Sequence, residues 1–213
     1  QNAFASLDPE TGRPTYDPKH KPTTGSTTSF CPSLWGGKDW PPAAYNPESG
    51  LLYIPANDNH CGVIEGREVT YMPGSAYMGA RTQMTVPEGA DHIGEIQAWD
   101  MNTGEEVWTR EFDSHNWGGI LTTSGNLIFS GGTSDRMFRA HNASTGELLW
   151  EFKTNSGIIG VPSTFSVDGK QYVAVQAGWG VDAASMTARL DMVRGTRTFV
   201  PQGGVIWVFA LPD

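Results

Sequence analysis

The sequence predicts an all-β protein built as part of a β-propeller, and three observations lead to this prediction. First, 26 glycines and 14 prolines are spread over 213 residues, so turns are frequent and long helices are not expected. Second, short runs of β-branched and aromatic residues recur along the chain, as is typical of strands. Third, one turn motif repeats after 42 residues, a period that fits a four-stranded propeller blade.

The predicted strands are short apolar runs bounded by turn residues. They lie at 51–54, 126–129, 171–175 and 205–209. No stretch of about a dozen residues shows an amphipathic helical pattern that is not interrupted by Gly or Pro, so few long helices are expected.

The repeat is clearest between residues 98–108 and 140–150, which align without a gap. Each copy has an Asp or Asn, a Thr-Gly pair and a final Trp, and weaker copies lie at 7–12 and 44–53. Asp or Asn accepts hydrogen bonds from the amides of its own turn and Gly adopts a positive φ, so each copy is expected to join two antiparallel strands. The final tryptophans, Trp108 and Trp150, are predicted to dock one blade on the next.

Three blade-like units can be drawn, at 50–112, 125–152 and 169–211, and the last lacks its terminal hairpin. Insertions at 57–94 and 181–204 interrupt the first and third units at the same place in the pattern. The chain is therefore predicted to form about three to four blades of a larger propeller. Because a propeller removes its exposed edges by closing, we expect an N-terminal segment or a second chain to supply the remaining blades.

Charge and composition exclude some classes of partner. The chain has 14 Lys and Arg against 23 Asp and Glu, a formal net charge of −9, and it lacks the basic patch that nucleic-acid binding requires. No apolar run approaches the roughly 20 residues that cross a bilayer. We therefore expect neither a nucleic-acid partner nor a membrane span.

The two cysteines, Cys31 and Cys61, flank a predicted strand and show no metal-ligand spacing, which favours a disulfide. A disulfide indicates an oxidising compartment such as the periplasm. The histidines are scattered, with no haem-attachment motif, so surface or packing roles are expected and no metal ligand is predicted in this chain. They are His20, His60, His92, His115 and His141.

Several segments lie outside the repeat and are notable in combination: 31–47 with Gly-Gly-Lys-Asp-Trp-Pro-Pro, 50–55, 117–123 with Trp-Gly-Gly, 156–162 and 168–180. In order and spacing they resemble the C-terminal portion of the quinoprotein alcohol dehydrogenases of the methanol and ethanol dehydrogenase type. That family uses pyrroloquinoline quinone (PQQ) in an eight-bladed propeller. The resemblance covers nearly the whole chain, and the closing residues 205–212 are similar to the family's last strand, so the missing part is expected before Gln1.

The resemblance implies that Asp39, Trp117 and the Trp179-Gly180 pair form part of the rim of the quinone site. It implies PQQ and Ca²⁺ as cofactors. The catalytic Asp and the metal ligands belong to the family's N-terminal portion, so we expect no catalytic residue and no metal ligand in this chain. The implied reaction is oxidation of an alcohol, or a related hydroxyl substrate, by hydride transfer to the quinone. Electrons then pass to an external acceptor such as cytochrome c, because no haem domain lies in this chain.

Each of these residues also has a structural interpretation. Asp39 stands where several relatives have Asn, and it either lies near the cofactor, binds a cation or a lysine from the missing part, or caps a turn. Trp117 and Trp179 either meet a flat cofactor or pack inside the propeller. For the chain as a whole, the alternative is a non-catalytic propeller scaffold that binds peptides, but a scaffold gives no reason for the segments outside the repeat.

Overall fold

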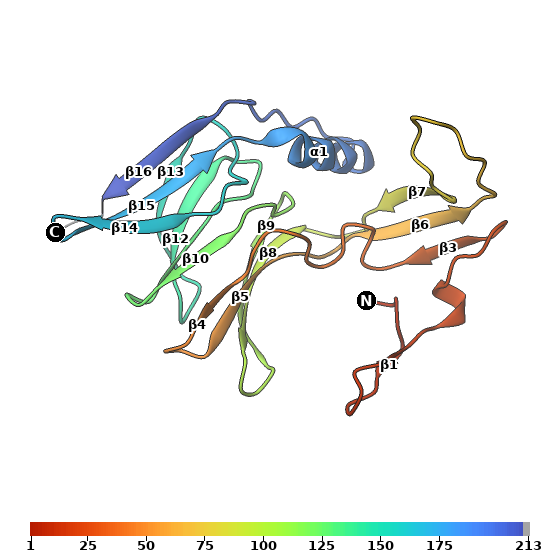
Figure 1. Cartoon of the computed structure of the whole chain (residues 1–213), viewed down its shortest axis with the longest axis horizontal. Coiled ribbons are helices and arrows are strands. Elements are labelled where there is room, and N and C mark those ends of the chain that lie inside the picture. Colours follow the sequence, from red (N-terminus) through yellow and green to blue (C-terminus); the bar gives the residue numbers. More distant parts are fainter. Residues whose placement is uncertain (211–213) are drawn as a thin grey trace. The chain divides into compact units, whose positions relative to one another are not determined.

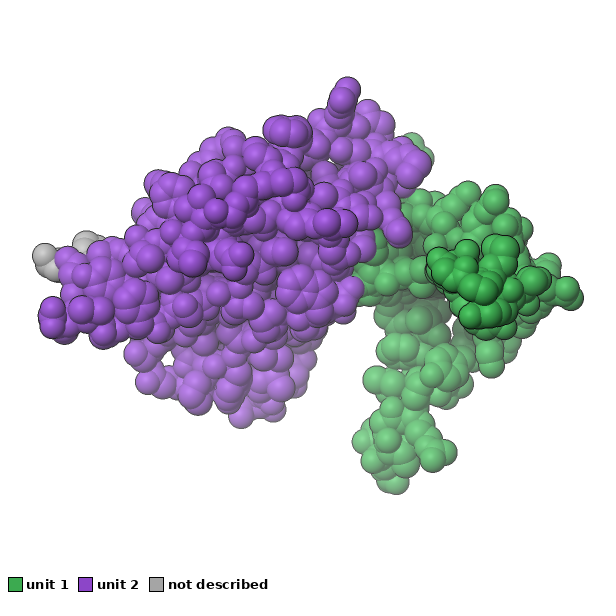
Figure 2. All heavy atoms as spheres, turned by 45° about the horizontal axis from the view of Figure 1, so that its top comes forward, with its two compact units in different colours: residues 1–37, 59–90 green, residues 38–58, 91–213 purple. Residues whose placement is uncertain are grey.

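The structure, a computed structural model, describes residues 1–210 and consists mainly of short antiparallel strands (Figure 1). It divides into a smaller unit of residues 1–37 and 59–90 and a larger unit of 38–58 and 91 onward (Figure 2). The predicted all-β class is confirmed, although one α-helix is present among the described residues.

The larger unit contains three antiparallel sheets. In each of them, every strand pairs with the next strand of that sheet along the chain. The first is β4 (Ala44–Asn46), β5 (Leu51–Asn57), β8 (Gly94–Asp100) and β9 (Glu106–Phe112); the second is β10 (Ile120–Thr123), β11 (Leu127–Ser130), β12 (Met137–Asn142) and β13 (Leu148–Lys153); the third is β14 (Ser163–Val167), β15 (Lys170–Ala177) and β16 (Val205–Ala210). Two complete four-stranded blades and a three-stranded sheet therefore stand where three blade-like units were predicted.

The repeated Thr-Gly motif closes hairpins as predicted. Asp100 accepts a hydrogen bond from the amide of Asn102 at 2.7 Å, and Gly104, with φ at 73°, completes the turn between β8 and β9. The same geometry recurs 42 residues later between β12 and β13, where Asn142 bonds the amide of Ser144 and Gly146 has φ at 69°. The weaker copies join β4 to β5 and β1 (Ser6–Leu7) to β2 (Pro14–Thr15).

The tryptophan that ends each strong copy contacts the next sheet. The indole nitrogen of Trp108 donates to the carbonyl of Ala143 at 3.0 Å, and its ring lies directly against Gly146. Trp150 packs against Phe209 of β16, with ring centroids 5.1 Å apart. Between these sheets lie two apolar clusters, one around Ile96 and Ile128 and one around Phe138 and Val175. The predicted docking role of both tryptophans is thus observed.

The third sheet ends at β16, which pairs with β15 and has no further strand beside it in the described part of the chain. Ile206 and Val208 are 71% and 52% exposed on this strand. The predicted last strand, 205–212, matches β16 as far as Ala210, and residues 211 and 212 lie outside the described residues. Completion of this sheet by another segment or chain stays a prediction.

Both predicted insertions contain regular structure. Strands β6 (Cys61–Gly66) and β7 (Ala80–Thr85) fall within 57–94 and pair with β3 (Thr27–Phe30) in the smaller unit. That unit also holds β1, β2 and a short 3₁₀ helix, η1 (Pro18–His20). The disulfide between Cys31 and Cys61 is confirmed, and it joins the end of β3 to the start of β6.

The sequence predicts few long helices, and the second insertion holds one that was not located, α1, which runs from Gly180 to Arg194. Glycines flank this helix instead of interrupting it, and Gly195 ends it with φ at 67°. Its buried residues are Ala183, Thr187 and Leu190, so small and polar side chains on the buried face conceal the amphipathic pattern. Among the described residues, no helix combines the length and apolar character that crossing a bilayer requires.

We predict that Gly146→Ala destabilises the protein more than Gly104→Ala does. Both glycines occupy the same turn position with nearly the same φ, so both variants incur a backbone penalty of about 1 kcal/mol. A methyl at Gly146 would also lie 2.6 Å from Trp108, whereas one at Gly104 would meet nothing within 4 Å. Overpacking should add roughly 1–3 kcal/mol, measured as the free energy of unfolding in denaturant. Equal losses would show that the Trp108 contact does not hold the sheets together.

Candidate functional site

The residues predicted from the resemblance lie at one end of the sheets of the larger unit. Asp39 precedes β4, Trp117 precedes β10, and Trp179-Gly180 follows β15. In an antiparallel meander, the start of the first strand and the end of the second strand are at the same end of the sheet. Figure 1 shows α1 at this end, between β15 and β16.

Ring contacts bring three of these places together. Trp40, next to Asp39, meets Trp117 edge to face with ring centroids 6.5 Å apart. His115 lies between the two predicted tryptophans, 6.1 Å from Trp117 and 5.4 Å from Trp179. Sequence reasoning did not single out Trp40 or His115 for this site, because only the packing of three sheets makes them neighbours.

Trp117 and Trp179 are each only 1% exposed. The indole nitrogen of Trp117 donates to Asp182 at 2.8 Å, and that of Trp179 donates to Thr187 at 3.2 Å. A methyl on Gly157 would lie 2.0 Å from the Trp179 ring, so this ring rests directly on the main chain. The packing role of both side chains is therefore observed, and contact with a quinone stays a prediction.

His115 is fully buried among these aromatic rings. Burial lowers its pKa to about 4, and the nearby charge of Asp182 opposes that shift. The imidazole is consequently neutral at pH 7. Its predicted packing role agrees with this position, and it adds no positive charge to the site.

Asp39 is exposed on an irregular segment before β4. Its carboxylate accepts from the amide of the next residue, Trp40, at 2.7 Å. The neighbouring Lys38 ammonium donates to the carbonyls of Asp39 and Pro41 rather than to the carboxylate. Its exposure leaves the Asp39 side chain open to solvent, and its proximity to a cofactor stays a prediction.

A hollow of about 370 Å³ lies beside Trp179, whose two neighbours in the chain are among the residues that line it. Its lining consists of Ile159, Gln176 and five glycines, Gly160, Gly178, Gly180, Gly203 and Gly204. Helix α1 begins at Gly180, and its N-cap residue, Trp179, makes no side-chain cap. The first amides of a helix and the positive end of its dipole favour a negatively charged group.

A group of possible metal ligands, Asp58, His92 and Glu95, lies at the same end of the first sheet, with donor atoms within 4.8 Å of one another. His92 bonds Glu95 at 2.9 Å through one ring nitrogen and Asp91 at 2.8 Å through the other. No metal ligand is expected from the sequence, in which the pairing of β5 with β8 that brings residue 58 near residue 92 is not evident. Because His92 already pairs with the carboxylates around it, we assign no metal to this group.

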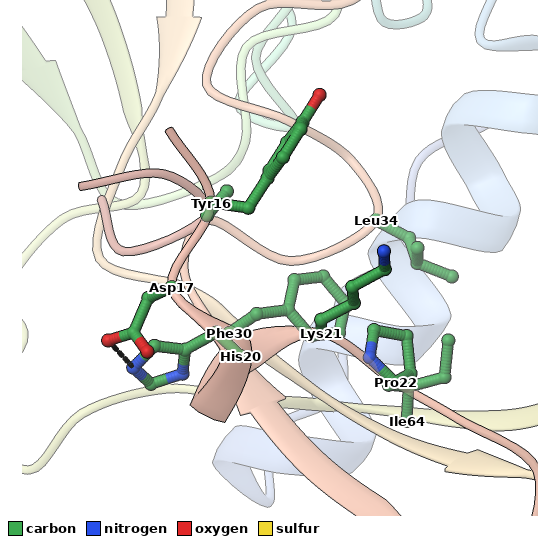
Figure 3. Close-up of a pocket in the computed structure, with 9 residues that line it drawn as sticks. Tyr16, Asp17, His20, Lys21, Pro22, Phe30, Leu34 and Ile64 are labelled. Atoms are coloured by element: carbon green, nitrogen blue, oxygen red, sulfur yellow. Dashed lines mark ion pairs between the residues drawn. The ribbon is translucent and has the colours of Figure 1, made fainter. Parts of the chain in front are cut away.

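A second hollow, of about 510 Å³, belongs to the smaller unit (Figure 3). Its lining is mostly apolar and includes Phe30, Leu34 and Ile64. Figure 3 shows the His20 imidazole facing the Asp17 carboxylate, and the two groups are 3.9 Å apart. None of the predicted cofactor residues lines it.

We predict that His92 makes stability dependent on pH. Burial alone lowers its pKa, but hydrogen bonds to Asp91 and Glu95 and the charge of Glu111 raise it above its ordinary value overall. Its stabilising contribution is therefore complete below pH ~6.5 and is lost as the pH rises through the higher folded-state pKa. The difference in unfolding free energy between wild type and His92→Gln should be larger at acidic than at alkaline pH.

Glu111→Gln serves as the control for this measurement. It removes one of the charges that raise the pKa of His92 while leaving the imidazole in place. The pH dependence should become weaker in this variant. A wild-type advantage over His92→Gln that is constant from acidic to alkaline pH would contradict the assignment.

Comparisons with known proteins agree with this architecture. Residues 109–173 match the domain family described as glucose/ethanol/alcohol dehydrogenase, beta-propeller domain. The chain is 39% identical over 207 residues to the quinoprotein alcohol dehydrogenase PedH of Pseudomonas putida, a match that spans 94% of the chain and 34% of that relative. It is 42% identical to a lanthanide-dependent methanol dehydrogenase of Methylacidiphilum fumariolicum, over 84% of the chain and 30% of that relative.

Solved structures give the same result. A europium-containing methanol dehydrogenase superposes with a TM-score of 0.84 at 35% identity, over 99% of this chain and 39% of that one. The quinohemoprotein alcohol dehydrogenase of Comamonas testosteroni superposes with a TM-score of 0.77 at 28% identity, over 98% and 31% of the two chains. The chain thus spans about a third of the length of the relatives it matches. By sequence and by fold, the chain is similar to part of the quinoprotein alcohol dehydrogenases, consistent with a C-terminal portion of that family's propeller.

Proposed function

We propose that this chain forms the C-terminal part of a PQQ-dependent dehydrogenase that oxidises an alcohol or a related hydroxyl substrate. Electrons would then pass to an external acceptor such as cytochrome c. The observation that most supports the proposal is the glycine-lined hollow at the start of α1, beside the aromatic cluster of Trp117, His115 and Trp179.

The hollow suits part of a flat, anionic group. A methyl on Gly204 would meet nothing within 4 Å, and one on Gly178 would approach only the carbonyl of Gly203 at 3.0 Å, so side chains here would fill the space. The uncapped start of α1 offers amides that suit a carboxylate. PQQ carries carboxylates on a planar ring system, so the residues present fit it.

When bound, PQQ supplies the hydride-accepting chemistry, and the protein supplies binding and orientation. We propose that the amides at Gly180 hold a carboxylate of the cofactor. Trp117 and Trp179 form a rigid, water-excluding wall behind that place, because both rings are buried and hydrogen-bonded. The base that accepts the proton from the alcohol is proposed to lie on the N-terminal portion, outside this chain.

We also propose that a metal ion accompanies the quinone, with ligands from the N-terminal portion. We favour Ca²⁺, while two relatives described above are named as lanthanide-dependent and europium-containing. The Cys31–Cys61 disulfide supports a proposed location in the periplasm, where disulfides persist.

We predict that Gly204→Ala in the full-length protein weakens PQQ binding with little loss of stability. The added methyl would project into open space at the hollow without a clash inside the protein. If a ring of the cofactor or one of its carboxylates occupies that space, affinity should fall about tenfold, a cost typical of overpacking a fitted contact. Affinity can be measured by titrating the apoprotein with PQQ and following the quinone absorbance.

Gly125→Ala is the matched control. Gly125 lies in the hairpin between β10 and β11, and a methyl there would make only an ordinary contact at 3.7 Å. This variant should bind PQQ like the wild type. If Gly204→Ala also binds PQQ like the wild type, the hollow is not part of the cofactor site. If the full-length wild type binds no PQQ, the proposed function is wrong.

A further prediction concerns removal of the metal. Treating the full-length holoenzyme with a strong chelator should release the quinone or abolish its activity, because a cation beside the cofactor offsets the negative charge of its carboxylates. Separate addition of Ca²⁺ and of a lanthanide ion, followed by assay of alcohol oxidation, then identifies the metal. Full activity that survives complete removal of metal would contradict the proposal.

A further inference from the structure

Helix α1 is inserted in the third sheet, but it also forms hydrogen bonds with segments next to the first and second sheets. Although it is inserted between β15 and β16, the Asp182 carboxylate at its first turn accepts from Trp117, which leads into β10 of the second sheet. At its last residue, Arg194 donates to the carbonyl of Asp113 at 2.7 Å, directly after β9 of the first sheet. The helix is therefore anchored at both ends to the segment that links the first two sheets.

The middle of the same helix holds the second tryptophan. The hydroxyl of Thr187 accepts from the Trp179 indole at 3.2 Å and donates to the carbonyl of Ala183 at 2.9 Å. Thr187 is buried, and its own bond to the helix backbone fixes the direction in which its hydroxyl can accept. One helix thus supplies the hydrogen-bond acceptor for both buried indole nitrogens.

These hydrogen bonds determine ring orientation, which the apolar contacts do not specify. Both rings pack in a cluster with Ala183 and Val200, and such contacts are not directional. A buried indole N–H without an acceptor is costly, so each ring settles with its nitrogen toward α1. Trp179 directly precedes Gly180, which lines the hollow, so holding its ring in place restrains the main chain at the start of α1.

We propose that Asp182 and Thr187 are positioning residues for the quinone site, which set the orientation of Trp117 and Trp179 and, through Trp179, the amides at the start of α1. This inference rests on the proposed function. In this proposal neither Asp182 nor Thr187 touches the cofactor, because each acts through a tryptophan.

The test uses the full-length protein and pairs each disruptive variant with a conservative one. Asp182→Ala and Thr187→Val remove the acceptors, and each should weaken PQQ affinity about tenfold. Asp182→Asn keeps a carbonyl oxygen and Thr187→Ser keeps a hydroxyl, so both should stay within about twofold of wild type. If the conservative variants lose as much affinity as the disruptive ones, the proposal is overturned.

Arg194→Ala distinguishes positioning from general loosening of the helix. The substitution removes an anchor of α1. In the described structure, the hydrogen bond of the Arg194 side chain goes to the carbonyl of Asp113 and to neither tryptophan. We expect this variant to have a lower melting temperature, because it loses an exposed charge-assisted hydrogen bond. Its PQQ affinity should stay within about twofold of wild type, because that bond does not orient either tryptophan. A loss of affinity equal to that of Asp182→Ala would overturn the proposal.

A second readout needs no cofactor. The near-ultraviolet circular dichroism of the apoprotein reports the fixed environment of tryptophans, and it should change in Asp182→Ala and Thr187→Val but not in their conservative partners. Unchanged spectra in all four variants would overturn the positioning role. If wild type binds PQQ and Asp182→Ala binds it equally well, this inference alone fails, whereas no PQQ binding by wild type overturns the proposed function as well.

Discussion

The docking of one sheet on the next holds the larger unit together and positions its candidate site. At the first interface, the ring of Trp108 rests on the glycine that closes the turn of the following sheet, and its nitrogen bonds the carbonyl of Ala143. Neither sheet can shift or rotate without breaking this contact. The ends of the strands are consequently held in register, and the connections that begin and end there meet reproducibly as neighbours.

The candidate site is built from those connections. Segments that precede β4 and β10 and follow β15 supply Trp40, Trp117 and Trp179, with His115 between the two predicted tryptophans. Helix α1 then joins the third sheet to the link between the first two by bonds from Asp182 and Arg194. Rigid sheets with functional connections at one end are the usual way in which such folds combine precision with a variable surface.

Burial changes the meaning of the predicted site residues. The tryptophans that the resemblance places near a quinone have almost no exposed surface, so their side chains act as a wall and the nearby glycine backbone is the better candidate for direct contact. His115 remains neutral in this environment because burial lowers its pKa. The pieces that complete the site are proposed to come from the N-terminal portion, which the relatives possess.

The sequence alone predicts several strands of the larger unit, its repeated hairpins and the docking tryptophans, because these depend on local turn chemistry and on a period that recurs along the chain. It did not reveal α1, whose buried face is Ala, Thr and Leu rather than a continuous apolar stripe. Nor did it reveal that Asp182 and Thr187 hold the two tryptophans. The bond between Asp182 and Trp117 joins residues far apart in the chain, and only the packing of three sheets decides which such residues meet.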